Sequence, residues 1–140
     1  MNRVVQASAS RPWLGIEGDT ISVHLPGARV LVTAVGPAVP EEGRFPVPAT
    51  SPCTFTVTFT ALAGTIELSR RSFTILDELS HLHVPRVTVA DGRPMPRFLA
   101  AGRTVTLIVR DVLPTGGGQL RWAPSGAKAI ASWDFDVEID

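Results

Sequence analysis

Two histidines separated by a single residue, His81 and His83, are the side chains of this sequence whose types and spacing point most directly to chemistry. On an extended strand, positions i and i+2 lie on the same face, so the two imidazoles could chelate one Zn²⁺ or Cu²⁺ ion. Asp77 and Glu78 lie just upstream, but no third ligand is fixed by spacing, and His24 is the remaining histidine. The alternative interpretation is a pair of solvent-facing histidines on an edge strand.

Acidic residues alternate with apolar residues at the end of the sequence, where Asp134, Asp136 and Glu138 share one parity. Carboxylate oxygens are ligands that Ca²⁺ prefers. Alternate positions of a strand are about 6.8 Å apart, however, which is too far for all three side chains to bind one ion. We therefore expect a solvated strand face here.

The single cysteine, Cys53, excludes an internal disulfide, and it lies on an apolar parity that predicts burial. A reactive thiol needs a partly open site with positive charge nearby, and no Lys, Arg or His is close to Cys53 in the sequence. The sequence also lacks the G-x-S-x-G, H-E-x-x-H, G-x-x-x-x-G-K-[ST] and G-x-G-x-x-G motifs. These observations favour a protein without catalytic residues and without a cofactor.

The segment from Cys53 to Leu62 is the clearest strand of the sequence. Its odd-numbered positions are apolar and its even-numbered positions up to Thr60 are threonine, so one face is predicted to be buried and the other to be wet. Threonine is β-branched, so the wet face also favours an extended backbone. We expect the other strands to pack on the face that carries Phe55 and Phe59.

The rest of the sequence predicts eight or nine short strands separated by turn signals, with no helix of ten residues. Residues 20–35 are typical of a hairpin around Pro26-Gly27, and residues 104–112 alternate cleanly between apolar and polar. Within residues 81–89 the apolar parity changes at Pro85-Arg86, which predicts an edge strand with either a bulge or a bend. The pattern favours an all-β sandwich or barrel.

The three tryptophans would form a carbohydrate-binding platform if they were exposed. Trp133 lies on an inward parity and Trp122 shares its face with Leu120, so we expect both indoles in the core. Trp13 is then expected to be the most exposed of the three.

A length of 140 residues is sufficient for one domain with its own core. We expect residues 13–140 to form a single β-sandwich domain, preceded by a flexible N-terminal lead over residues 1–12. The formal net charge is zero, so the sequence gives no reason to expect nucleic acid or an anionic membrane as a partner. No apolar run is long enough for a transmembrane segment, and residues 1–11 lack the apolar region of a secretory signal peptide.

Charge is nevertheless distributed unevenly along the sequence. Residues 86–121 contain six arginines and two aspartates, whereas residues 129–140 contain four acids and no base. Opposite charges on adjacent antiparallel strands contribute a few tenths to about 1 kcal/mol per facing pair. We therefore predict that residues 104–112 pair with residues 129–139.

Three stretches carry a resemblance to a known kind of domain, namely Cys53-Thr-Phe-Thr-Val-Thr-Phe, Thr104-Val-Thr-Leu-Ile-Val and Trp133-Asp-Phe-Asp-Val-Glu. The run from Cys53 to Asp140 is similar to immunoglobulin-like domains of unknown function in secreted or lipid-anchored actinobacterial proteins, and mycobacterial secreted immunogenic antigens share that sandwich. The resemblance implies an immunoglobulin-like antiparallel β-sandwich with an extracellular or envelope location and no catalytic residues. This sequence departs from antibody-type domains because it has no cysteine pair and no tyrosine.

The leading hypothesis is a non-catalytic binding or structural domain, extracellular or at the cell envelope, whose partner is a protein or another envelope component. Its predicted contact surfaces are the proline- and glycine-containing loops at residues 36–52 and 91–102. The first alternative is a metal-binding domain or enzyme that uses His81 and His83. The second is a small β-barrel whose aromatic interior binds an apolar small molecule.

Overall fold

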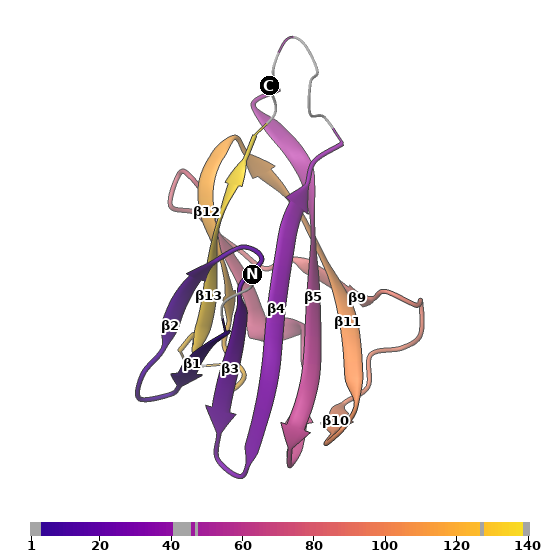
Figure 1. Ribbon diagram of the computed structural model, residues 1–140. Helices are drawn as coiled ribbons and strands as arrows, with labels where there is room; N and C mark the ends of the chain where they lie inside the picture. Colours follow the sequence, from indigo (N-terminus) through magenta and orange to yellow (C-terminus); the bar gives the residue numbers. More distant parts are fainter. Residues whose placement is uncertain (1–3, 41–45, 47, 127, 139–140) are drawn as a thin grey trace.

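The computed structural model describes residues 4–40, 46, 48–126 and 128–138, which form thirteen β-strands and one 3₁₀ turn. Figure 1 shows two sheets that face each other. This arrangement, with the lone cysteine free, confirms the expected all-β sandwich without a disulfide. The described strands outnumber the eight or nine predicted, because several are only two to five residues long and leave a weak sequence pattern.

The first sheet has six strands in the order β1-β3-β4-β5-β11-β9. These strands are β1 (Val4–Ser8), β3 (Thr20–Leu25), β4 (Ala28–Ala38), β5 (Thr50–Ala63), β11 (Thr104–Pro114) and β9 (Arg86–Val89). The second sheet has five strands in the order β2-β13-β12-β7-β8. These strands are β2 (Trp13–Ile16), β13 (Ala131–Val137), β12 (Gly116–Trp122), β7 (Phe73–Leu76) and β8 (Leu82–His83). A separate antiparallel pair consists of β6 (Thr65–Glu67) and β10 (Phe98–Ala100), and the 3₁₀ turn η1 is Arg70–Ser72.

Strand β5 lies in the middle of the first sheet, between β4 and β11 (Figure 1). Its predicted alternation is confirmed, because Phe55 and Phe59 are almost completely buried. Phe55 meets Phe135 of the second sheet edge to face at 4.8 Å between ring centroids, and Phe59 meets Trp122 in the same manner at 5.1 Å. Aromatic rings from both sheets therefore fill this part of the interior. The alternative prediction of a small β-barrel that binds an apolar molecule in its interior is wrong. The strands form two facing sheets, and these aromatic rings pack against one another between them.

The predicted hairpin over residues 20–35 is also confirmed. Strands β3 and β4 pair in antiparallel register from Thr20 opposite Thr33 to Leu25 opposite Ala28, and Gly27 takes a positive φ of 72° in the turn. The three tryptophans lie where they were expected, since Trp122 and Trp133 are in the core and Trp13 is the most exposed of the three, at 38%.

The predicted pairing of residues 104–112 with residues 129–139 is wrong. Strand β11 lies in the first sheet between β5 and β9, whereas β13 lies in the second sheet between β12 and β2. Each strand buries its own apolar face, through Leu107 and Val109 on β11 and Trp133 on β13. Burying one such side chain contributes about 1.5–3 kcal/mol, which outweighs the few tenths from a surface charge pair.

The parity change within residues 81–89 has a different cause from the predicted bulge or bend. Strand β8 is the edge of the second sheet and β9 is the edge of the first, so the chain passes from one sheet to the other at Val84-Pro85. Val87 and Val89 of β9 are buried, whereas Leu82 of β8 is 60% exposed. The expected edge position is thus correct for both strands, and the change of sheet explains the change of parity.

The expected flexible lead over residues 1–12 requires a correction. Residues 4–8 form strand β1, which pairs in parallel with β3, and Ala7 is buried. Parallel pairing joins segments without a tight turn between them, so no local turn signal marked this strand. Residues 1–3 lie outside the described part of the chain.

The two predicted loops are shorter than expected. Strand β4 continues to Ala38 and β5 begins at Thr50, while residues 41–45 and 47 of the 36–52 loop lie outside the described residues. The loop over residues 91–102 contains the short strand β10. The described residues include no helix with the length and apolar character needed to cross a membrane.

Candidate functional site

Of the two predicted metal ligands, His83 lies in the edge strand β8 and His81 just before it, and both are near the carboxylate of Asp77. His83 places Nε2 2.7 Å from Oδ2 of Asp77, and its Nδ1 is 3.5 Å from Oδ1 of Asp111 on β11. His81 is far more exposed, and its Nδ1 is 3.9 Å from the same Asp77 oxygen. Both ring nitrogens of His83 therefore face carboxylates. Within the described residues, no group of three or more His, Cys, Asp or Glu side chains is arranged to hold a metal ion, and metal binding by His81 and His83 stays a prediction.

Asp77 organises the turn between β7 and β8. Its side chain is only 4% exposed, and Oδ1 accepts hydrogen bonds from the backbone N–H groups of Leu79 and His81. The pKa of Asp77 is lowered, mainly by the hydrogen bond from His83. Desolvation raises this pKa, and the hydrogen bonds from the two backbone N–H groups lower it further. An aspartate followed closely by a turn is a common local signal, which the sequence interpretation did not use.

We expect Asp77→Asn to remove a pH-dependent part of the protein's stability while keeping an oxygen for the two backbone donors. Because the pKa of Asp77 is lowered in the folded state, its contribution is fully present above about pH 4 and is lost as the pH falls through the lowered value. Chemical denaturation from about pH 6 to about pH 2 measures the free energy of unfolding of both proteins. The difference between them should shrink below about pH 4, and a difference that stays constant would contradict this role.

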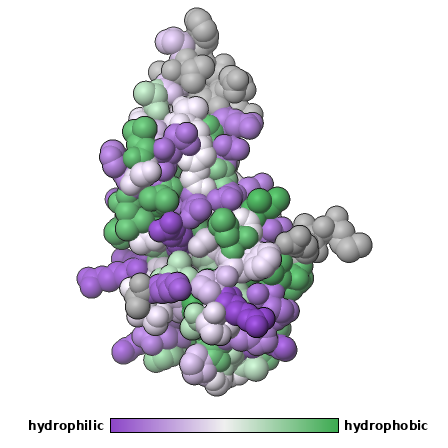
Figure 2. Space-filling view, turned by 90° about the vertical axis from the view of Figure 1, so that its left-hand side faces the viewer, coloured by the Kyte–Doolittle hydropathy of each residue, from purple (hydrophilic) through white to green (hydrophobic). Residues whose placement is uncertain are grey.

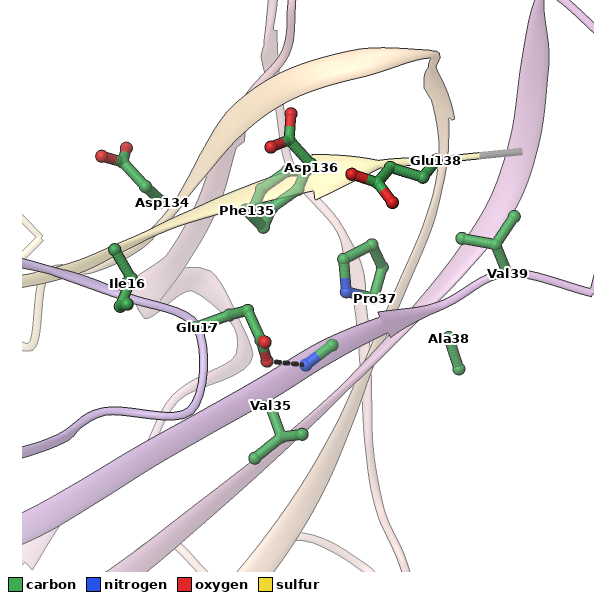
Figure 3. Close-up of a pocket in the computed structure, with 11 residues that line it drawn as sticks. Ile16, Glu17, Val35, Pro37, Ala38, Val39, Asp134, Phe135, Asp136 and Glu138 are labelled. Carbon is green, nitrogen blue, oxygen red and sulfur yellow. Dashed lines mark hydrogen bonds between the residues drawn. The ribbon is translucent and has the colours of Figure 1, made fainter. Parts of the chain in front are cut away.

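A groove of about 660 Å³ lies between the two sheets at the ends of β2, β4 and β13 (Figure 3). We call it the acidic groove; it is lined by Ile16, Glu17, residues 35–39, residues 134–136 and Glu138. Figure 3 shows the three carboxylates of β13 and its continuation spaced along one side, with Glu17 on the other side next to β4. The alternation of β13 creates this arrangement, because Phe135 turns into the core while the acidic side chains on either side of it turn out.

Hydrogen bonds to both sheets hold Glu17 in place. Its backbone N–H donates to the carbonyl oxygen of Asp134 at 2.8 Å, and its Oε2 accepts the N–H of Gly36 at 3.0 Å. The next residue, Gly18, donates its N–H to the carbonyl oxygen of Ala34 on β4. The turn between β2 and β3 therefore bridges β13 and β4, which fixes the width of the groove.

The acidic groove combines negative charge with accessible apolar surface. Its lining includes four carboxylates and no basic residue. Ile16 and Val35, which also line it, are 63% and 50% exposed. Figure 2, which views the left-hand side of Figure 1, shows apolar surface interspersed with hydrophilic side chains. Such a surface is suited to a cationic segment that also carries apolar side chains.

Some components of this groove could be predicted from the sequence, but their assembly could not. Asp134, Asp136 and Glu138 were expected on a solvated strand face, and the 36–52 loop was expected to be a contact surface. The groove arises because β13 lies near β4 in the opposite sheet, a contact that no local pattern reveals. The run of acids without a base after residue 129 was the available signal.

Cys53 has the inert character that the sequence predicted. It is 1% exposed, and burial raises its pKa to about 11, with the nearby charge of Asp111 acting in the same direction and a backbone hydrogen bond from Leu113 opposing it. The thiol is therefore protonated at neutral pH, and the side chain serves as a small apolar group in the core.

No protein-family model matches this chain, and no curated protein matches it. Among solved structures, the fold is similar to MPT63, a secreted protein from Mycobacterium tuberculosis, with a TM-score of 0.60 and 14% identity over 91% of this chain and 100% of that one. A putative lipoprotein from Bacillus subtilis subsp. subtilis str. 168 gives a TM-score of 0.50 and 9% identity, over 81% of this chain and 39% of that one. At these identities the likeness establishes a shared β-sandwich fold, of the type found in a secreted actinobacterial protein.

Proposed function

We propose that this protein is a non-catalytic, immunoglobulin-like binding domain that works outside the cell or at the cell envelope. The acidic groove would receive a positively charged segment of a protein or of another envelope component. Two observations of different kinds support the proposal. The acidic groove gathers four carboxylates without a basic residue, and the two similar solved structures are a secreted protein and a putative lipoprotein.

The acidic groove carries the proposal because its charge is unbalanced and its shape is fixed by backbone contacts. Three of the carboxylates, on Asp134, Asp136 and Glu138, make no ion pair with another described residue. Each exposed pair that a partner's lysine or arginine forms with them contributes roughly 0.2–1 kcal/mol. The exposed Ile16 and Val35 add apolar contact, while the clustered negative charge speeds association with a cationic partner and selects against anionic ones.

A pull-down from envelope extract tests the proposal. The wild-type protein should retain a component that elutes as the salt concentration rises, because exposed charge pairs are screened by salt. The double variant Asp134→Asn/Asp136→Asn should retain roughly tenfold less of it, since two charge pairs are lost.

The matched control is the Glu67→Gln/Asp91→Asn variant, which loses the same two negative charges at exposed carboxylates that do not line the acidic groove. It should retain the same component as the wild type. Equal capture by the Asp134→Asn/Asp136→Asn variant, or a partner found only in cytoplasmic extract, would contradict the proposed function.

A further inference from the structure

A second groove, of about 780 Å³, carries the opposite charge to the acidic groove and lies where β9 and β11 pass the 3₁₀ turn η1. Four arginines line it, from three different elements: Arg70 and Arg71 of η1, Arg86 of β9 and Arg110 of β11. We call this the arginine groove. The ion pairs found among the described residues involve other side chains, so these four guanidinium groups have no carboxylate partner there.

Two of the arginines repel each other within the sheet. Arg86 and Arg110 are directly opposite in the antiparallel ladder between β9 and β11, and both are exposed. Like charges at facing positions destabilise a strand pair. The one acid that lines the arginine groove, Asp111, has its Oδ1 3.5 Å from Nδ1 of His83. No described carboxylate forms an ion pair with Arg86 or Arg110, and an anion seated between them would relieve their repulsion.

The positive surface continues into an adjoining hollow of about 430 Å³. Arg70 and Arg110 line both spaces, and Arg93 lines the second. Arg93 already forms a long ion pair, since its Nε is 3.8 Å from Oδ2 of Asp91. Because the two hollows share two arginines, a ligand with two linked anionic groups would bind there more tightly than a ligand with a single anionic group. Thr88 lines both hollows, and its side chain carries a hydroxyl that can donate a hydrogen bond to a bound anion.

Apolar side chains flank the positive charge at the arginine groove. Val84 and Val112 line it and are 73% and 54% exposed. Large exposed apolar side chains beside a cluster of guanidinium groups suit an organic ligand with a charged end and an apolar remainder. The guanidinium fork matches the oxygens of phosphate, and a phosphate group has enough oxygens to accept from two arginines at once.

We propose that the arginine groove and its adjoining hollow form a binding site for a diphosphate-bearing ligand. Arg86 and Arg110 hold one phosphate group between them, Arg70 and Arg93 contact the second, and the organic remainder lies against Val84 and Val112. This site is separate from the acidic groove, so it would be a second binding function of the same sandwich.

Calorimetric titration of the folded protein with inorganic pyrophosphate tests this site. Pyrophosphate should bind about tenfold more tightly than inorganic phosphate, because its second phosphate group adds contacts with the remaining arginines. It should also raise the melting temperature, since binding to the folded state alone stabilises it. The double variant Arg86→Gln/Arg110→Gln should bind pyrophosphate at least about tenfold more weakly.

The control variant Arg29→Gln/Arg103→Gln loses the same net charge at two exposed arginines that line neither hollow, and it should bind like the wild type. The site would be overturned by equal pyrophosphate binding in the two double variants, or by phosphate binding as tightly as pyrophosphate. Vesicles of phosphatidylglycerol provide a further arm. If they bind through Arg86 and Arg110 while pyrophosphate does not, the surface recognises a membrane and the diphosphate assignment is wrong.

Discussion

The Phe59→Ala variant is expected to lose about 3–5 kcal/mol of unfolding free energy, a large share of the stability of a domain of this size. Phe59 is fully buried and contacts Phe73 and Trp122 of the second sheet, at 6.0 Å and 5.1 Å between ring centroids. Removing the ring leaves a cavity at the contact between the sheets, which the surrounding backbone cannot close. Urea denaturation followed by tryptophan fluorescence measures the loss.

Thr56→Ala is the matched control, because Thr56 lies on the same strand and points to the exposed face. Its cost should stay below about 1 kcal/mol, since little packing is lost there. If the two substitutions cost the same, the sandwich does not depend on the buried face of β5.

The Gly64→Ala variant is expected to lose roughly 2–5 kcal/mol, for two reasons that add. Gly64 has a positive φ of 69°, which costs an L-residue about 1–2 kcal/mol. A Cβ at this position would also lie 2.1 Å from the carbonyl oxygen of Gly27, in the turn of the β3/β4 hairpin. That oxygen belongs to the backbone, so the turn itself must move. Thermal and urea denaturation both report the loss.

Gly126→Ala separates these two causes. Gly126 has a similar φ of 80°, but a Cβ there would meet nothing within 4 Å. Its cost should therefore be about 1–2 kcal/mol, the conformational part alone. Equal costs at the two glycines would show that the close approach of Gly64 to the hairpin turn is unimportant.

The sequence predicted those parts of the fold that local patterns determine. Alternation over Cys53–Leu62 identified the buried face of β5, and Pro26-Gly27 located the β3/β4 hairpin, because parity and turn chemistry act over a few residues. The resemblance of this chain to mycobacterial secreted antigens also predicted the correct fold class. The stretches that carry the resemblance are strands, and their alternation is typical of a sandwich.

The pairing of distant strands could not be predicted in the same way. Opposite charges predicted β11 beside β13, but the two strands lie in opposite sheets because each must bury its own apolar residues. The change of parity at Pro85-Arg86 predicted a bulge or a bend, although it follows the passage of the chain from one sheet to the other. Both errors concern which of the two sheets a strand joins. The alternation within a single strand indicates its buried face but not the sheet to which it belongs.

The candidate sites show the same limit. A net charge of zero gave no reason to expect nucleic acid or an anionic membrane as a partner, and it does not reveal that the fold gathers acids in one groove and arginines in another. Arg86 and Arg110 are distant in sequence, and only the register of β9 on β11 places them opposite each other. His83 was predicted from its spacing to His81, whereas its closest contact is with Asp77, through the turn that joins β7 to β8.

Backbone amide NMR on the ¹⁵N-labelled protein, titrated with a short peptide of alternating lysine and leucine, tests the proposed binding role of the acidic groove most directly. We expect chemical shift changes at Glu17, Val35, Asp134 and Asp136 that are saturable and largely absent from the Asp134→Asn/Asp136→Asn variant. Changes scattered over both sheets, or the same changes in that variant, would contradict recognition of cationic segments by this groove.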